Sequence, residues 1–137
     1  MNKLSGTIIH VESSKTIALV DVQVHNDIFS AIVLDTLGNG SYLKKGSAVT
    51  LLFKETEVSI GKNLSGLISL RNRIAARVKN IERSKILSKV VLDYQGSEIV
   101  SSITTRSVDR LDLKPGEPVE WLVKANEMTL FHSATKL

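Results

Sequence analysis

The sequence contains no cysteine, few aromatic residues and no long apolar run. The absence of cysteine excludes disulfide bonds and thiolate metal sites, and it is typical of cytoplasmic proteins. Aromatic residues make up 4% of the 137 positions, which is little for a surface that binds nucleic acid by base stacking. No apolar run approaches the ~20 residues that span a bilayer. The N-terminus has no basic region followed by an apolar stretch, so we expect neither a membrane segment nor a signal peptide.

Positive charge is concentrated in the second half of the chain, which has a formal net charge of +4 overall. Residues 1–66 hold six Lys/Arg and six Asp/Glu, whereas residues 67–137 hold twelve and eight. This bias predicts an anionic partner, either a polymer or a small ion. With 42% hydrophobic and 23% charged residues, the composition is that of a globular protein.

The chain consists of two copies of one pattern, about seventy residues apart. "NKLSGTIIHVESSK" (2–15) aligns with "NRIAARVKNIERSK" (72–85), and "YLKKGSAVTLLFKETEVSI" with "RLDLKPGEPVEWLVKANEMTL" near the end of each copy. "FSAIV" aligned with "VSSIT" places Val33 opposite Thr104. The stretch "GKNLSG" (61–66) is a polar, glycine-containing linker. We therefore predict two domains, 1–64 and 65–137.

Strand patterns dominate both copies. Apolar residues alternate through the second predicted strand of each copy, at Ala18, Val20, Val22 and Val24 and again at Ser88, Val90, Leu92 and Tyr94. This period of two is typical of half-buried strands. Each copy has about five short strands and one short helical segment, which is too little chain to bury both faces of a flat sheet. The prediction is an all-β protein with two tandem OB-like, five-stranded antiparallel β-barrels.

The helical segment of the second copy is predicted over Thr104–Leu111, with Thr105 or Ser107 as its N-cap. A Leu-Lys-x-Gly turn follows this segment in both copies.

Three motifs of the second copy form a family pattern. They are "SLRN" (69–72), the Leu-Lys-Pro-Gly turn (113–116) and the Lys-Ala step at 124–125. Together they resemble the Mop (molybdenum-pterin-binding, or molbindin) domain, which is also grouped with the TOBE domains. The first copy resembles the weaker half of a tandem (di-Mop) protein, and the resemblance spans about residues 1–131. It implies binding of molybdate or tungstate.

The resemblance also implies a set of ligand contacts. They fall on Ser69, Leu70, Arg71, Thr104, Ser107, Arg110 and Lys124, with Asn72, Ala125 and Lys54 as secondary candidates. Molybdate is a tetrahedral dianion that accepts hydrogen bonds and donates none, so it requires converging N–H groups, hydroxyls and cations. The loop 69–72 can offer consecutive backbone N–H groups, as anion-binding nests do. We expect no organic cofactor and no metal other than that of the oxyanion.

The sequence departs from the family pattern at several positions. Leu70 replaces the usual Ala, and Ala76 stands where the family often has Gly, which the first copy keeps as Gly6. The first copy has no Ser-x-Arg-Asn, although Lys54 answers Lys124. We therefore interpret the first copy as scaffold and interface with a degenerate site.

The function implied by the resemblance is a cytoplasmic molybdate- or tungstate-binding protein for molybdenum storage or homeostasis. Ligand sites between the subunits of a homo-oligomer are expected, with a trimer favoured and a dimer as the alternative. We expect neither a DNA-binding nor a nucleotide-binding domain and no membrane partner. His10, His25 and His132 form no metal-ligand spacing and no nucleophile–base pair is evident, so we expect no catalysis.

Alternatives remain at this point. The basic run Arg73–Lys89 favours a single-stranded nucleic-acid-binding module. An accessory or regulatory subunit of a molybdate transport system is a further hypothesis. Arg110 and Lys124 could simply pair with Asp109, Asp112 or Glu127, and Trp121 could belong to the core or to a subunit interface.

Overall fold

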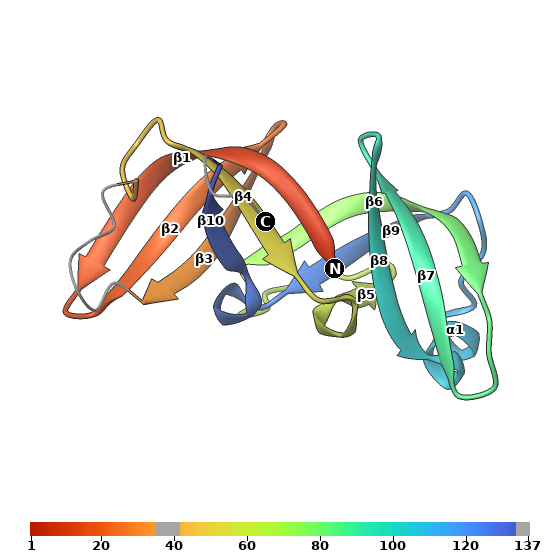
Figure 1. Cartoon of the computed structure of the whole chain (residues 1–137). Helices are drawn as coiled ribbons and strands as arrows, with labels where there is room; N and C mark the ends of the chain where they lie inside the picture. The colour runs from red at the N-terminus through yellow and green to blue at the C-terminus, as the bar shows by residue number, and fades with distance from the viewer. Residues whose placement is uncertain (35–41, 134–137) are drawn as a thin grey trace. The chain divides into compact units, whose positions relative to one another are not determined.

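The computed structural model describes residues 1–34 and 42–133. The chain forms two compact units, each built on one five-stranded sheet (Figure 1). The first unit contains residues 3–53 and the chain from Lys124 onward, and the second contains residues 54–123. None of the described helices is long and apolar enough to cross a membrane.

The first unit has the strand order β10-β4-β1-β2-β3. Its strands are β1 (Asn2–Ser14), β2 (Ile17–Val24), β3 (Asp27–Leu34), β4 (Ala48–Phe53) and β10 (Thr129–His132). Ala18, Val20, Val22 and Val24 of β2 are all buried. The alternation in the sequence therefore does mark the inward face of this strand.

The second unit repeats this arrangement with the order β5-β9-β6-β7-β8. Its strands are β5 (Ser59–Gly61), β6 (Asn72–Glu82), β7 (Leu87–Tyr94), β8 (Ser97–Thr104) and β9 (Pro118–Val123). Trp121 is fully buried and meets the Tyr94 ring edge-on, with ring centroids 5.6 Å apart. Of the two predicted places for Trp121, the structure shows the core.

Each repeat gives its last strand to the other repeat's sheet. β5, from the first repeat, pairs with β9, and β10, from the second repeat, pairs with β4. The short 3-10 helices η1 (Glu55–Glu57) and η2 (Ala125–Glu127) precede these strands and contact β8 and β3 respectively. The predicted domains 1–64 and 65–137 thus describe the sequence repeat, whereas the compact units change at Phe53/Lys54 and Val123/Lys124.

The two edge strands of each sheet also approach each other. β10 contacts β3 in the first unit, and β5 contacts β8 in the second. Curling a five-stranded sheet in this way protects its edges, which is the predicted barrel architecture. The all-β prediction of two tandem OB-like barrels is confirmed.

The helical segment of the second copy is confirmed as α1 (Thr105–Leu111), but its N-cap is Thr104. The predicted caps, Thr105 and Ser107, were wrong because both residues already have helical positions inside the first turn. The corresponding segment of the first copy falls on residues 35–41, outside the described part of the chain.

The strand registers correct the alignment of the two copies by one residue. In β2–β3 Ile17 pairs with Leu34, and in β7–β8 Leu87 pairs with Thr104. Leu34 of the first copy is therefore equivalent to Thr104 of the second, and the predicted match of Thr104 with Val33 was wrong. The first copy still lacks a hydroxyl at this position.

The glycine at position 6 of the first unit is explained by a lack of space for a side chain. A Cβ atom there would lie 2.6 Å from both the Gln23 carbonyl oxygen and a methyl group of Val22. The second unit accommodates Ala76 at the equivalent position of β6, where the side chain is half-buried.

Candidate functional site

The loop that carries Ser-x-Arg-Asn is anchored by its last residue. Asn72 is fully buried, and its side-chain amide donates a 2.9 Å hydrogen bond to the Val123 carbonyl, its partner in the β6–β9 ladder. Ser69 and Arg71 are exposed and Leu70 is half-buried. Asn72, a secondary ligand candidate, thus anchors the end of the loop in the core of the unit, while Ser69–Arg71 face solvent. We call Ser69–Arg71 the linker half-site.

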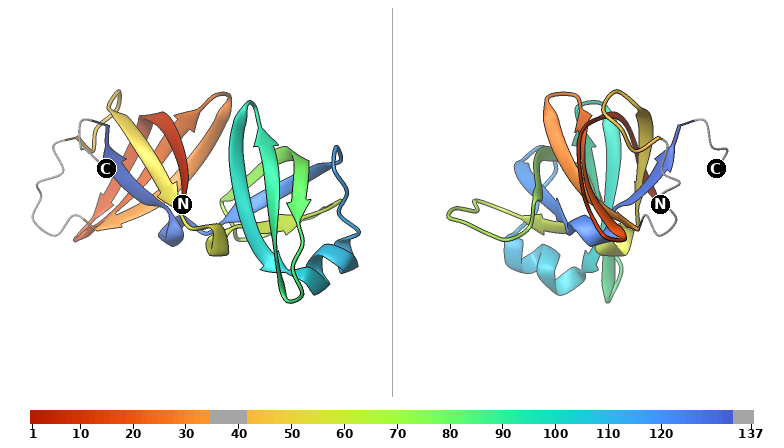
Figure 2. Two further views of the ribbon diagram at one scale, coloured as in Figure 1. Left: turned by 45° about the vertical axis from the view of Figure 1, so that its right-hand side comes forward. Right: turned by 90° about the vertical axis from the view of Figure 1, so that its left-hand side faces the viewer.

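Arg73 braces the linker loop (residues 62–71) against β9. Its guanidinium bonds the Glu120 carboxylate at 2.8 Å and the carbonyls of Leu64 and Gly66 at 3.1 and 3.4 Å. The hydrogen bond to Glu120 raises the pKa of Arg73. The loop projects from the second unit (Figure 2, right). Its geometry is therefore set by a side chain that sequence analysis assigned only to a basic run.

A second cluster lies at the start of α1. The Thr104 hydroxyl accepts the Ser107 backbone N–H at 3.1 Å and donates to the Ser107 hydroxyl oxygen at 2.9 Å. Because the Ser107 oxygen accepts this bond, its own proton remains for an external acceptor. Arg110 is exposed in the last turn of the same helix. Thr104, Ser107 and Arg110 form what we call the helix half-site.

Thr105 fixes this helix to the β6–β7 hairpin. Its hydroxyl donates to the Ser84 carbonyl at 2.6 Å and lies 2.7 Å from the Ser88 hydroxyl, and its backbone N–H donates to the Ile86 carbonyl at 2.8 Å. These bonds satisfy backbone groups at the helix start and hold the helix half-site rigidly.

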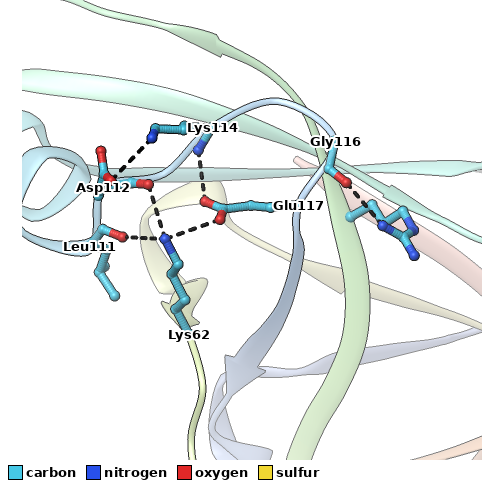
Figure 3. Close-up of polar contacts among 7 residues, drawn as sticks. Lys62, Leu111, Asp112, Lys114, Gly116 and Glu117 are labelled. Carbon is cyan, nitrogen blue, oxygen red and sulfur yellow. Dashed lines mark hydrogen bonds and ion pairs between the residues drawn. The ribbon is translucent and has the colours of Figure 1, made fainter.

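Lys62 ties the linker loop to the other end of α1 (Figure 3). Its ammonium donates to the carbonyls of Leu111 and Asp112 at 2.9 and 3.0 Å and pairs with Glu117 at 3.0 Å. The second Glu117 carboxylate oxygen accepts the Lys114 backbone N–H at 2.7 Å. Lys62 thereby satisfies carbonyls that the helix end leaves open, and together with the Lys114 bond it lowers the pKa of Glu117.

Glu117→Gln should destabilise the second unit at neutral pH but not in acid. A lowered pKa means that the charged form stabilises the fold above the ordinary glutamate pKa, and that this contribution is lost as pH falls through the lowered pKa. We expect a loss of about 1 kcal/mol at pH 7, given that the pair is partly exposed. Urea unfolding of wild type and variant at pH 7 and at pH 3 should show a gap that closes in acid. A gap of equal size at both pH values would contradict the assigned pairing.

The three candidate cations are free of acidic partners. The side chains of Arg71, Arg110 and Lys124 are exposed and make no hydrogen bond or ion pair with any described residue. Of the three carboxylates considered as their partners, Asp109 pairs with Arg83 and Asp112 with Lys114, and Glu127 forms no ion pair with Arg110 or Lys124. The structure therefore does not support simple surface pairing of Arg110 and Lys124.

Lys54 and Lys124 hold equivalent places in the two copies. Each is exposed, has extended backbone and directly precedes a 3-10 helix, η1 and η2 respectively. Lys124 follows Val123, the ladder partner of Asn72. Ala125 is half-buried as the first residue of η2.

The linker and helix half-sites lie at opposite ends of β6. Asn72 pairs with Val123 at the start of this strand, whereas Glu82 pairs with Lys89 at its end, beside the Leu87–Thr104 pair. Figure 1 shows β6 running to the side of the unit where α1 lies. Ten residue steps correspond to roughly 30 Å along a strand. One chain therefore cannot bring both half-sites to a single small anion.

Most of the basic run Arg73–Lys89 is neutralised within the second unit. Four ion pairs involve it, namely Arg73–Glu120, Lys79–Glu98, Arg83–Asp109 and Lys89–Glu55. Arg77 donates to the Gly116 carbonyl at 2.9 Å. Arg71 and Arg110, the cations of the two half-sites, lie outside this run. No group of His, Asp and Glu among residues 1–34 and 42–133 could hold a metal ion.

Comparison with known proteins identifies the family. The TOBE domain model matches residues 68–130. A solved structure of the cytoplasmic molybdate-binding protein ModG, with molybdate bound, is 30% identical and superposes with a TM-score of 0.88 over 94% of each chain. The chain belongs to the tandem Mop (TOBE) domain family.

Curated relatives place Mop (TOBE) domains in several settings. The molybdenum import ATP-binding protein ModC of Brucella abortus (strain 2308) is 33% identical over 111 residues, covering 76% of this chain and 31% of ModC. The molybdenum-pterin-binding protein MopB of Rhodobacter capsulatus is 33% identical over 90 residues, covering 64% and 33% of the two chains. The chain thus spans about a third of the length of these relatives.

Proposed function

We propose that this tandem Mop protein binds molybdate or tungstate in the cytoplasm, for molybdenum storage or homeostasis. The observation that carries this proposal is the set of exposed cations without acidic partners, Arg71 and Arg110 in the second unit and Lys124 directly after it in the chain, whereas most of the basic run is already paired. Backbone N–H groups of the loop 69–71 and the Ser107 hydroxyl supply the donors that an oxyanion requires. Membership of a family that includes molybdate-bound ModG supports it.

The binding site is shared between protomers in this proposal. The linker half-site of one chain meets the helix half-site of another, and Lys124 of the first chain directly follows Val123, the ladder partner of Asn72. The separation of the half-sites along β6 supports such an arrangement, because no tetrahedral anion reaches both in one chain. A homo-oligomer follows, with a trimer favoured by the family resemblance and a dimer as the alternative.

Calorimetric titration tests the proposal directly. Molybdate and tungstate should bind with a stoichiometry that matches the number of half-site pairs, and sulfate serves as the competing tetrahedral dianion. The absence of binding by molybdate and tungstate at micromolar concentration would overturn the proposed function.

A second candidate is an accessory or regulatory subunit of a molybdate transport system. The match to about a third of ModC, an import ATP-binding protein, favours this candidate. Copurification with a transporter ATPase, together with no oxyanion affinity, would support it over storage. The nucleic-acid hypothesis has less support, because four cations of the basic run already pair with carboxylates. We propose no catalytic activity.

A further inference from the structure

Exposed apolar side chains flank both half-sites of the second unit. Leu67 and Ile68, the linker pair, directly precede Ser69 and are 105% and 50% exposed. Ile86 and Leu87, the hairpin pair, are 72% and 52% exposed. The hairpin pair is joined to the helix half-site, because the Ile86 carbonyl accepts the Thr105 N–H at 2.8 Å and Leu87 pairs with Thr104. Large aliphatic side chains exposed in this way beside polar groups are typical of interaction surfaces.

The linker pair is presented on a braced support. Arg73 holds the carbonyls of Leu64 and Gly66, and Lys62 fixes the start of the loop to the end of α1. Leu67 and Ile68 lie between these anchors and the buried Asn72. The loop therefore displays two apolar side chains at little additional cost in conformational entropy on binding.

Electrostatics alone would keep the two half-sites apart. Each half-site carries an exposed cation without an acidic partner, Arg71 in one and Arg110 in the other. Two such faces repel until an anion lies between them. Apolar contact at the same seam would offset this repulsion and would also exclude water from the anion, which strengthens each charge-assisted hydrogen bond.

We infer that the linker pair of one protomer packs against the hairpin pair of a second copy of this chain, forming an apolar lock beside each oxyanion site. The inference rests on the proposed function, since the shared oxyanion site is what brings the two half-sites together. Within one chain the pairs sit at opposite ends of β6, so the contact is intermolecular. The lock makes this chain's Leu67, Ile68, Ile86 and Leu87 determinants of assembly as well as of affinity.

The absence of cysteine allows a clean cross-linking test. Leu67→Cys chains and Ile86→Cys chains, assembled together and treated with a short thiol-to-thiol cross-linker, should yield a covalent dimer. Each variant alone should yield little. Ile28→Cys, at a similarly exposed isoleucine of the first unit, is the matched control partner for both variants. Cross-linking no stronger than with the Ile28→Cys partner would overturn the lock.

A second measurement does not depend on cross-linker geometry. Leu67→Ser and Ile86→Ser should each raise the concentration at which the oligomer dissociates by roughly tenfold, as expected for losing a buried aliphatic contact. Ile28→Ser should leave it unchanged in the same sedimentation experiments. Calorimetric titration of the wild-type protein with molybdate distinguishes a failure of the apolar lock from a failure of the proposed function. Molybdate binding without the Leu67–Ile86 cross-link refutes the lock alone, whereas the cross-link without molybdate binding refutes the proposed function alone.

Discussion

Arg71→Ala is expected to weaken molybdate binding by about 10- to 150-fold while leaving the apo fold intact. Losing a hydrogen bond to a charged group costs about 1.5–3 kcal/mol, which corresponds to this change in affinity. The fold should be unaffected, because the Arg71 side chain is exposed and forms no hydrogen bond or ion pair with any described residue. Calorimetric titration gives the affinity, and thermal unfolding without ligand gives the stability. An unchanged affinity would show that the linker half-site is misplaced.

Two control variants distinguish a direct contact with the anion from a general effect of net positive charge on affinity. Arg106→Ala removes the same charge from an exposed position of α1 that lies outside both half-sites, so it should change affinity little. Lys124→Ala should weaken binding as Arg71→Ala does, whereas Lys54→Ala should have a smaller effect. Lys54 and Lys124 both precede a 3-10 helix with the same extended backbone, so their structural costs should match. Equal losses at Lys54 and Arg71 would contradict the assignment of the first copy as degenerate.

The strands and the core were predictable because their information is local. A period of two in apolar residues marks an inward face wherever a strand borders a core, and Val20 and Val90 are both fully buried as expected. The repeat also predicted two equivalent sheets. The exchange of β5 and β10 was not predictable, because either sheet could pair with the same short apolar strand. Nothing in the local sequence specifies which of the two sheets β5 or β10 joins.

Errors in register and capping have a similar origin. The alignment placed Val33 against Thr104 because it matched the Ser-x-Ile of "FSAIV" with that of "VSSIT". An alignment shifted by one residue fits the apolar pattern almost equally well. Only the ladder Leu87–Thr104 and its counterpart Ile17–Leu34 decide the register. Thr104, Thr105 and Ser107 can all cap a helix, and the backbone conformation of Thr104 selects it.

The candidate site was predictable as a set of residue types but not as a place. Resemblance identified Ser69–Arg71 and Thr104, Ser107 and Arg110, whose roles as ligands remain predictions. Their separation along β6 is a property of strand pairing that no motif contains. The supporting side chains were missed for the same reason, since Lys62 and Glu117 are common residue types that become informative only through their contacts.

Mixing two inactive variants should restore binding if each site is shared between chains. Arg71→Ala damages the linker half-site and Arg110→Ala damages the helix half-site, so each variant alone should lose most of its affinity. In a mixed oligomer, an intact linker half-site of an Arg110→Ala chain can meet an intact helix half-site of an Arg71→Ala chain. Random assembly of two such chains leaves about one quarter of the sites with both halves intact.

The restored fraction is measurable because intact sites keep wild-type affinity. The two chains are coexpressed with different tags, and mixed oligomers are isolated on both tags and confirmed by mass spectrometry. Because only mixed oligomers are retained, calorimetry should then show about one third of the wild-type stoichiometry at wild-type affinity for a trimer, or about one half for a dimer, followed by weaker sites. The Arg71→Ala protein coexpressed with a differently tagged copy of itself is the control and should show no such sites. Mixed oligomers without high-affinity sites would mean that both half-sites do not act on one anion, because only a site built from two chains can be rescued by a partner.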